Sequence, residues 1–263
     1  MRPTMTRRMM MLALLAWACT AAPAVSAASP PVDDAATAQA LAQAETRGRE
    51  MFEHDLAAER ATDALLKKGM RGDSRVRGWI TEPKDNRYEV SMIGEGDVVL
   101  YRATTDAQGN LAGATEALAV PAAPTAYQAG AAAARALATQ SRIDACAKRY
   151  NSVVLPAPGA TNDAWTVYLL PATTDPAAVP LGGSYRFDIA QGRITSQRAF
   201  TRSCIQLKRA RRNAAMIVTH MLDPTPTEVH VFWSLWARSP LYVTTGEDAI
   251  WKIEDGHIHR VQD

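Results

Sequence analysis

The chain has 263 residues, of which 47% are hydrophobic and 21% are charged, and its formal net charge is +2. The first 27 residues hold three arginines and no acidic residue, so the remainder carries 26 basic and 27 acidic side chains. This near-neutral balance excludes a broad electrostatic attraction to nucleic acid, whereas about 236 residues suffice to bury a substantial core as one domain or two small ones.

Residues 1–27 have the order of a secretory signal peptide. Three arginines precede an apolar run over residues 9–18, and small residues follow up to Ala27. Cleavage after Ala27 predicts a periplasmic or secreted protein. The apolar run has about half the length that a helix needs to cross a bilayer, and no later segment is longer, so we expect no transmembrane span.

A competing interpretation makes Cys19 the lipidated N-terminus of a bacterial lipoprotein. Such processing usually requires a leucine three positions before the cysteine, and Ala16 occupies that position. The sequence therefore favours a cleaved signal over a lipid anchor. Residues 28–36 contain Pro30 and Pro31 and are expected to form a flexible leader.

A helical pattern follows over residues 35–68, which are rich in Ala, Glu, Gln, Leu and Arg. Apolar residues recur on one stripe, and Gly69 is placed to end the helix. The pattern fits one long helix or two helices broken near Gly48. His54, between Glu53 and Asp55, is expected to be an exposed helix residue.

Short β-type runs separated by turn residues come next, at residues 76–81, 88–93, 98–104 and 111–120. The short connections favour an antiparallel meander. A second, alanine-rich helix is predicted from Thr125 to about Tyr150.

The second half again shows strand-type runs after a helix. They are predicted at residues 153–155, 165–170, 185–190, 194–200, 215–222, 229–236, 241–245, 250–254 and 257–261. The predicted fold class is α+β, with antiparallel β-meanders packed against two main helices. Helix followed by meander occurs twice, which suggests two lobes, residues 37–121 and 124–263, although one continuous domain fits the same pattern.

Cys146 and Cys204 are the two cysteines that remain after cleavage. In an oxidising compartment, a pair without metal-type spacing favours a disulfide. The bridge would close a loop of about 58 residues, for which the chain-entropy model gives roughly 4 kcal/mol of stabilisation. The alternative is two unrelated buried thiols.

A dense basic run, Lys208, Arg209, Arg211 and Arg212, follows Cys204. Guanidinium groups bind phosphate or carboxylate oxygens in pairs, so the run is a candidate site for an anionic envelope component. The alternative is a solvated loop or helix face. No interleaved aromatic residues support binding of single-stranded nucleic acid.

Residues 217–233 contain a candidate metal or catalytic site. If 217–222 and 228–233 form a hairpin symmetric about Thr225, His220 lies opposite His230 and Glu228 shares their face. Two imidazoles and a carboxylate hold zinc or iron with open positions for water, and Asp223 would either support a metal ligand through a hydrogen bond or serve as general base. The alternative is a structural histidine pair beside two aromatic residues, and a one-residue slip of the register would remove the metal site.

A C-terminal hairpin is predicted around Asp255-Gly256, a pair typical of a two-residue type I′ turn. The resulting register places Trp251 opposite Arg260 and Ile253 opposite Ile258. Lys252 then faces His259 and Glu254 faces His257, while Trp251, Ile253 and Ile258 form the buried side. His257 and His259 are interpreted as part of a solvated strand face.

Two classes of function follow from these patterns. The first is an exported envelope protein that binds an envelope component or a protein partner without turnover, for which no cofactor is expected. The second is a metal-dependent hydrolase that uses His220, His230, Glu228 and Asp223 with zinc or iron.

Overall fold

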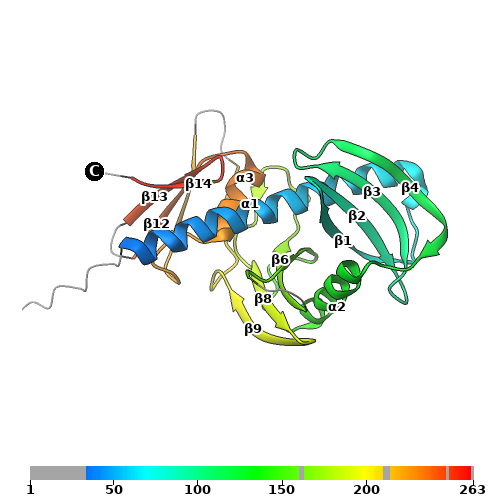
Figure 1. Ribbon diagram of the computed structural model, residues 1–263. Helices are drawn as coiled ribbons and strands as arrows, with labels where there is room; N and C mark the ends of the chain where they lie inside the picture. Colours follow the sequence, from blue (N-terminus) through cyan, green and yellow to red (C-terminus); the bar gives the residue numbers. More distant parts are fainter. Residues whose placement is uncertain (1–33, 160–162, 210–213, 247–248, 262–263) are drawn as a thin grey trace, which may run out of the picture.

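The computed structural model describes residues 34–159, 163–209, 214–246 and 249–261. The fold is α+β, as predicted, with three α-helices and three four-stranded sheets among these residues. Helix α1 runs across the molecule, with one sheet at each end and the other sheet and helix α2 beneath its middle (Figure 1). The predicted signal peptide lies outside the described residues.

Helix α1, Asp34–Leu65, is one continuous helix that begins within the predicted leader. It passes through Gly48 without a break and ends in a single π-helical turn, η1 (Leu66–Met70). Gly69 adopts a φ of 100° there, which explains why glycine ends the helix. At 32 residues, α1 is about 48 Å long and therefore contacts elements of all three sheets.

The first sheet is the predicted meander, with strand order β1-β2-β3-β4 and antiparallel pairing throughout. Asp85 and Asn86 form the first turn with φ angles of 45° and 52°, values that suit a tight hairpin. The C-terminal half of α1 packs on this sheet through Ala57, Ala61 and Leu65. Its strands are β1 (Val76–Lys84), β2 (Arg87–Gly94), β3 (Val99–Asp106) and β4 (Leu111–Ala122).

Helix α2, Ala126–Gln140, begins at a capping box in which Thr125 accepts from the backbone N–H of Gln128 and Gln128 bonds back. It ends ten residues before the predicted end at Tyr150, because Tyr150 is already the first residue of strand β5. The run of alanines gave no signal for where the helix stops, since alanine suits every position of a helix.

The second sheet, called here the middle sheet, is a meander in the order β5-β6-β8-β9. Helix α2 covers one face, where it packs on Trp165, Val167 and Leu169 of β6. Helices α1 and α3 cover the other face, where Tyr168 and Leu170 enter the core. Its strands are β5 (Tyr150–Pro156), β6 (Ala164–Pro171), β8 (Tyr185–Ala190) and β9 (Arg193–Ala199), and a two-residue pair joins β7 (Ala178–Val179) to β10 (Leu207–Lys208).

The third sheet has the order β11-β12-β13-β14 and departs from the prediction in one pair. Strands β11 and β12 are parallel, and helix α3 (Glu228–Ala237) forms the crossover between them. The prediction of a strand at residues 229–236 is therefore wrong, because these residues belong to helix α3. The strands are β11 (Met216–His220), β12 (Leu241–Thr245), β13 (Ala249–Glu254) and β14 (His257–Arg260).

The cause of this error lies in the burial of α3. Every residue from Glu228 to Ser234 is buried, so the helix has no polar stripe that would reveal a period of 3.6 residues. Its β-branched and aromatic residues then imitate a strand. The helix starts at Thr227, whose side chain forms a capping box with His230.

The C-terminal hairpin is confirmed in its register. Trp251 pairs with Arg260, Ile253 with Ile258, and the two remaining pairs are also as predicted. Asp255 and Gly256 have φ angles of 50° and 80°, as a type I′ turn requires.

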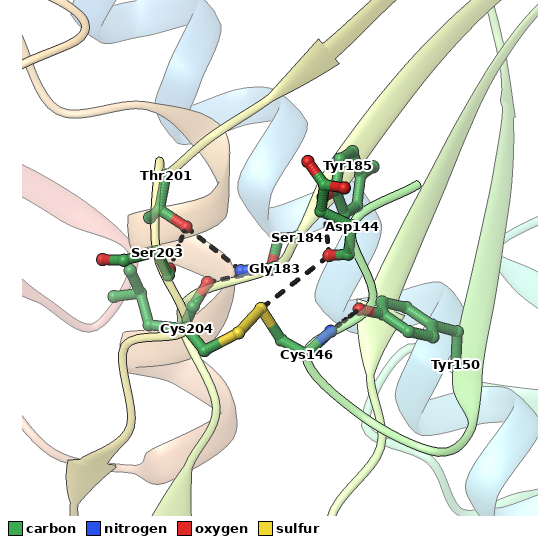
Figure 2. The surroundings of a disulfide bond; sticks show 10 residues. Asp144, Cys146, Tyr150, Gly183, Ser184, Tyr185, Thr201, Ser203 and Cys204 are labelled. Carbon is green, nitrogen blue, oxygen red and sulfur yellow. Dashed lines mark hydrogen bonds between the residues drawn. A yellow bond between two sulfur atoms is a disulfide. The ribbon is translucent and has the colours of Figure 1, made fainter. Parts of the chain in front are cut away.

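The predicted cysteine pair is joined: Cys146 and Cys204 form a disulfide with Cα atoms 5.3 Å apart (Figure 2). The bridge ties the segment before β5 to the segment after β9. The backbone N–H of Cys146 donates a hydrogen bond to the hydroxyl oxygen of Tyr150 at 2.8 Å. Gly183, at a φ of +86°, lies against the sulfur, where a Cβ atom would be 2.7 Å from Sγ of Cys146.

Within the described residues, none of the helices combines the length and the apolar character needed to cross a lipid bilayer.

Candidate functional site

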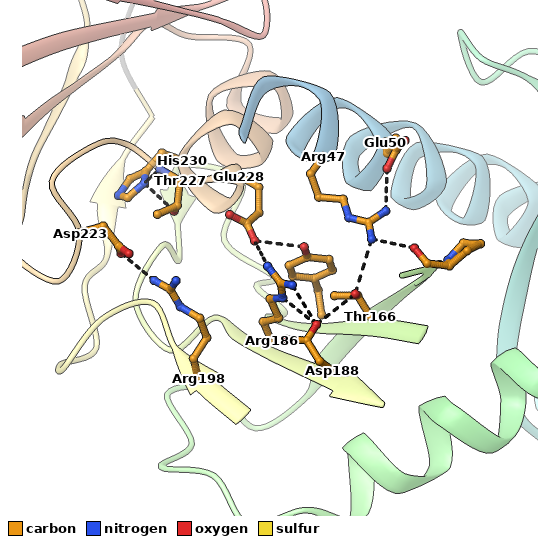
Figure 3. A network of polar contacts seen from close by, with 12 residues as sticks. Arg47, Glu50, Thr166, Arg186, Asp188, Arg198, Asp223, Thr227, Glu228 and His230 are labelled. Carbon is orange, nitrogen blue, oxygen red and sulfur yellow. Dashed lines mark hydrogen bonds and ion pairs between the residues drawn. The ribbon is translucent and has the colours of Figure 1, made fainter. Parts of the chain in front are cut away.

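A cleft of about 660 Å³ lies where α1, the middle sheet and the start of α3 meet. We call it the central cleft. Its walls come from Arg47 of α1, Arg186 of β8, Arg198 of β9 and the loop from Asp223 to Glu228. Figure 3 shows these arginines and carboxylates converging from the different elements. Two of the sequence-predicted site residues, Asp223 and Glu228, therefore line one cleft.

Asp223 connects a histidine to an arginine. Its Oδ2 atom lies 2.7 Å from Nε2 of His220 and 2.6 Å from Nη2 of Arg198. Burial alone would raise the pKa of Asp223, but the hydrogen bonds from His220 and Arg198 outweigh it and lower that pKa to about 2. Asp223 is therefore ionised at neutral pH, and its charge is satisfied by Arg198.

His220 and His230 come together, although no hairpin joins them. Their rings meet edge to face with centroids 4.6 Å apart. Nδ1 of His230 accepts the backbone N–H of Thr227 at 3.0 Å, which leaves the proton on Nε2, and this buried Nε2 has no partner among the described residues. Burial, and then the nearby His220, lower the pKa of His230 to about 3, so the ring is neutral.

Glu228 points away from His230 (Figure 3). Its Oε1 accepts a hydrogen bond from the hydroxyl of Tyr168 at 3.1 Å. The same oxygen forms an ion pair with Nη1 of Arg186 at 3.3 Å. Arg186 in turn holds Asp188, with Nε 2.9 Å from Oδ1. The carboxylate of Glu228 thus belongs to the middle sheet's polar network and not to a site shared with His220 and His230.

This arrangement removes the geometry on which the metal prediction depended. The predicted hairpin is a strand, a loop and a helix, so Glu228 no longer shares a face with the histidine pair. In the part of the chain that the structure describes, no three His, Cys, Asp or Glu side chains are arranged to hold a metal ion. His220 and His230 still contact each other, as residues of β11 and α3 and not across a hairpin.

The opposite wall is formed by Arg47 of α1. Its guanidinium donates to Glu50 at 2.8 Å and to the backbone carbonyl of Pro156 at 2.7 Å (Figure 3). A longer contact of 3.5 Å reaches Thr166, whose hydroxyl donates to Asp188 at 3.1 Å. Polar bonds therefore connect Arg47 on the helix with the middle sheet below it.

The charges of the cleft are balanced. Three guanidinium groups face three lining carboxylates, and two of the pairs, Arg186 with Glu228 and Arg198 with Asp223, join different elements. Such pairs fix the side chains in position before any ligand arrives. Arg198 is the most exposed of the three at 36%, and its Nε and Nη1 groups have no protein acceptor among the described residues. It is therefore the group best able to contact a ligand.

Sequence reasoning did not identify Arg47, Arg186, Arg198 or Tyr168. On β8 a signal exists, because Arg186 and Asp188 alternate with buried Tyr185 and Phe187 and so share the polar face of the strand. Arg47 is one of several arginines on α1 and carries no local signal. It joins the site only because α1 crosses the middle sheet.

The basic run lies away from these groups. Lys208 and Arg209 are exposed, and the guanidinium of Arg209 lies 4.9 Å from the centre of the Trp236 ring. Arg211 and Arg212 lie outside the described residues. Neither Lys208 nor Arg209 lines the central cleft.

Comparison of the chain with protein-family models, with curated proteins and with solved structures found no match. The class of protein is therefore defined by the fold and the cleft alone: an α+β protein with a charge-balanced, arginine-lined cleft at the junction of a helix and a meander.

Proposed function

We propose that this chain is an exported protein of the cell envelope that works by binding a ligand in the central cleft without converting it. The observation that carries the proposal is the pair of inter-element ion pairs, Arg186 with Glu228 and Arg198 with Asp223. They hold guanidinium groups at the cleft in fixed orientations, so little side-chain entropy is lost on binding.

The ligand in this proposal carries a carboxylate or phosphate group that contacts Arg198. A guanidinium group binds such oxygens with paired N–H groups, and Arg198 has Nε and Nη1 free for this contact. Its plane is supported from behind by Phe200, whose ring centre lies 4.6 Å from Cζ. Asp223 next to it limits the affinity for a bare anion, which favours a ligand with further polar groups.

The test uses two probes of this chemistry, inorganic phosphate and a short acidic peptide, with binding followed by NMR of the arginine Nε–H signals. For the probe that binds the unmodified chain, we expect R198Q to weaken the affinity by at least about tenfold. The affinity of R198K should lie between those of the unmodified chain and R198Q. R193Q, on the same strand and exposed, is the matched control and should bind normally. Equal binding by R198Q and the unmodified chain would refute the proposal.

The basic run adds a second contact surface to the proposal. Lys208 and Arg209 are exposed, which supports contact with anionic envelope material, and Arg211 and Arg212 follow in the sequence. Replacing the four residues by glutamine should weaken association with anionic lipid vesicles and flatten its salt dependence. Vesicle binding that is unchanged by the four replacements would exclude this surface.

Export is tested independently on the protein isolated from the cells that produce it. We expect the intact mass of a chain that begins at Ala28. This mass should be two hydrogens lower than that of the dithiol form, because Cys146 and Cys204 are joined. A chain that still begins at Met1 with free thiols would contradict export. A lipid-modified N-terminus at Cys19 would favour the lipoprotein alternative.

A further inference from the structure

A second cleft, of about 500 Å³, shares no lining residue with the central cleft. It lies along the middle of α1 and is bordered by β1, β5 and the C-terminal end of α3. Two tryptophans, Trp79 of β1 and Trp236 of α3, line it together with Asp55 and Asn151. We call it the tryptophan cleft.

Both indole rings are half-buried and held by guanidinium groups. Cζ of Arg209 lies 4.9 Å from the centre of the Trp236 ring, and Cζ of Arg135 lies 5.6 Å from the centre of the Trp79 ring. Arg135 is itself anchored by a 2.8 Å hydrogen bond from Nε to Ser152. The rings are therefore oriented by the fold, and rigid aromatic surface of this kind binds ligands at low entropic cost.

Polar groups lie beside the rings. The carboxyl of Asp55 is half-buried and has no hydrogen-bond partner among the described residues, and the same holds for the carboxamide of Asn151. Burial, with the charge of Glu59, raises the pKa of Asp55 to about 7. Near neutral pH these two groups therefore supply both donors and acceptors of hydrogen bonds.

The charged residues of this cleft nearly balance one another. Arg60, Arg209 and Arg238 are offset by Glu59, Asp63 and the partly ionised Asp55. A cleft with so small a net charge does not favour a polyanion or a polycation. A ligand that fits must instead offer flat apolar faces to the indoles and many neutral hydroxyl or amide groups to the side chains between them.

From this combination we propose that the tryptophan cleft binds a neutral saccharide chain. The C–H face of a pyranose ring packs on Trp79 or Trp236, while its hydroxyl groups bond to Asp55 and Asn151. The inference depends on the tryptophan cleft alone and is independent of the function proposed for the central cleft.

The experiment titrates the chain lacking residues 1–27 with three neutral probes: cellotriose, maltotriose and the trimer of N-acetylglucosamine. Binding is followed by calorimetry and by the NMR signals of the tryptophan Nε1–H groups. We expect at least one probe to bind and to shift the signals of Trp79 and Trp236 but not that of Trp251, which is buried in the third sheet.

Variants test the site further. W79A and W236A should each weaken saccharide binding by at least about tenfold, and D55N and N151A should weaken it less. Y242A removes a half-buried aromatic ring outside both clefts and should leave binding unchanged. Trp236 also packs against the core, so W236A could lose saccharide binding because it unfolds. W236F keeps an apolar ring in the core and serves as the control for this effect.

Three results would overturn the proposal. The first is that none of the three probes binds at concentrations up to about 10 mM. The second is that a probe binds but W79A and W236A both leave its affinity unchanged. The third is that binding shifts only the signals of tryptophans outside the cleft.

Discussion

At the residue scale, His54 shows that the exposure and the charge of a side chain depend on the residues packed around it. The sequence predicts an exposed residue, because Glu53 and Asp55 flank His54. The side chain is only 5% exposed and meets Tyr88 edge to face with ring centroids 5.0 Å apart. Burial, and then the charge of Arg47, lower the pKa of His54 to about 3. It therefore stays neutral in the folded chain.

The first prediction concerns acid stability through His54. As the pH falls below about 6.5, His54 binds a proton in the unfolded chain but not in the folded one, so acid favours unfolding. Between pH 7 and pH 5 the free energy of unfolding of the unmodified chain should fall by about 2 kcal/mol through His54 alone. H54Q should lack that loss in urea unfolding at the two pH values.

H259Q is the control for this measurement, because His259 is exposed. Its unfolding free energy should follow that of the unmodified chain at both pH values. An H54Q variant with unchanged pH dependence would show that His54 is not a buried neutral ring.

The second prediction concerns Asp223, whose folded pKa of about 2 lies below that of an unfolded aspartate. Its hydrogen bonds with His220 and Arg198 therefore stabilise the fold above about pH 4, and this stabilisation is lost as the pH falls toward 2. We expect D223N to lower the free energy of unfolding at pH 7 by about 2 kcal/mol. The difference from the unmodified chain should shrink below pH 4.

D97N replaces an exposed aspartate in a loop of the first sheet and should leave the unfolding free energy unchanged. If D223N and D97N are equally stable at pH 7, the Asp223 network contributes nothing to folding.

At the element scale, Gly48 marks the crossing of α1 and α3. The sequence raised the alternative of a helix break at this glycine, but the residue lies in an uninterrupted helix and is buried. A Cβ atom at Gly48 would lie 2.5 Å from Cβ of Val231 and 2.7 Å from the carbonyl oxygen of Glu228. Glycine is needed there because two helix backbones approach closely.

The third prediction follows from this contact. Alanine at position 48 would raise helix propensity by up to about 1 kcal/mol, but it would push α1 from α3 at a cost of about 1–3 kcal/mol. Because the contact is with backbone and Cβ atoms, which cannot rotate away, we expect G48A to be destabilised in thermal and urea unfolding. A stabilised G48A would mean that propensity dominates and that the two helices are not in contact here.

The candidate site also depends on elements more than on single residues. Their spacing to the histidines predicts Asp223 and Glu228 as site residues, and both line the central cleft. Their partners differ from those expected, because α3 is a helix and directs Glu228 toward Arg186 while His230 enters the core. Local spacing therefore identified the loop but not the direction of its side chains.

At the scale of the whole molecule, the disulfide joins segments 58 residues apart in sequence. Its loop contains β5, β6, β8 and β9, so the bridge closes the entire middle sheet. Because this sheet carries Arg186 and Arg198, the stability of the sheet and the integrity of the central cleft are coupled.

The fourth prediction is that removing the disulfide lowers the free energy of unfolding by about 4 kcal/mol, through the larger freedom of the unfolded chain. The measurement compares urea unfolding of the oxidised chain, of the reduced chain and of a variant with both cysteines replaced by serine. Reductant should not affect the serine variant. Equal stability of all three forms would contradict the prediction.

The sequence by itself determined features that depend on neighbours along the chain. The type I′ turn at Asp255-Gly256 set the register of the last hairpin, and turn residues separated the strands of the first meander. The α+β class and the cysteine pair followed in the same way, because turn conformation, alternation and the number of cysteines are properties of short segments and of composition.

Only the tertiary structure decided the identity of α3, the burial of His54 and the members of both clefts. A helix buried on all sides has no amphipathic pattern, and whether a side chain is exposed depends on what packs over it. Arg47, Arg198 and Asp223 are far apart in sequence and lie together because α1 crosses the middle sheet beside the loop before α3. Contacts of this kind come from packing, which no local pattern encodes.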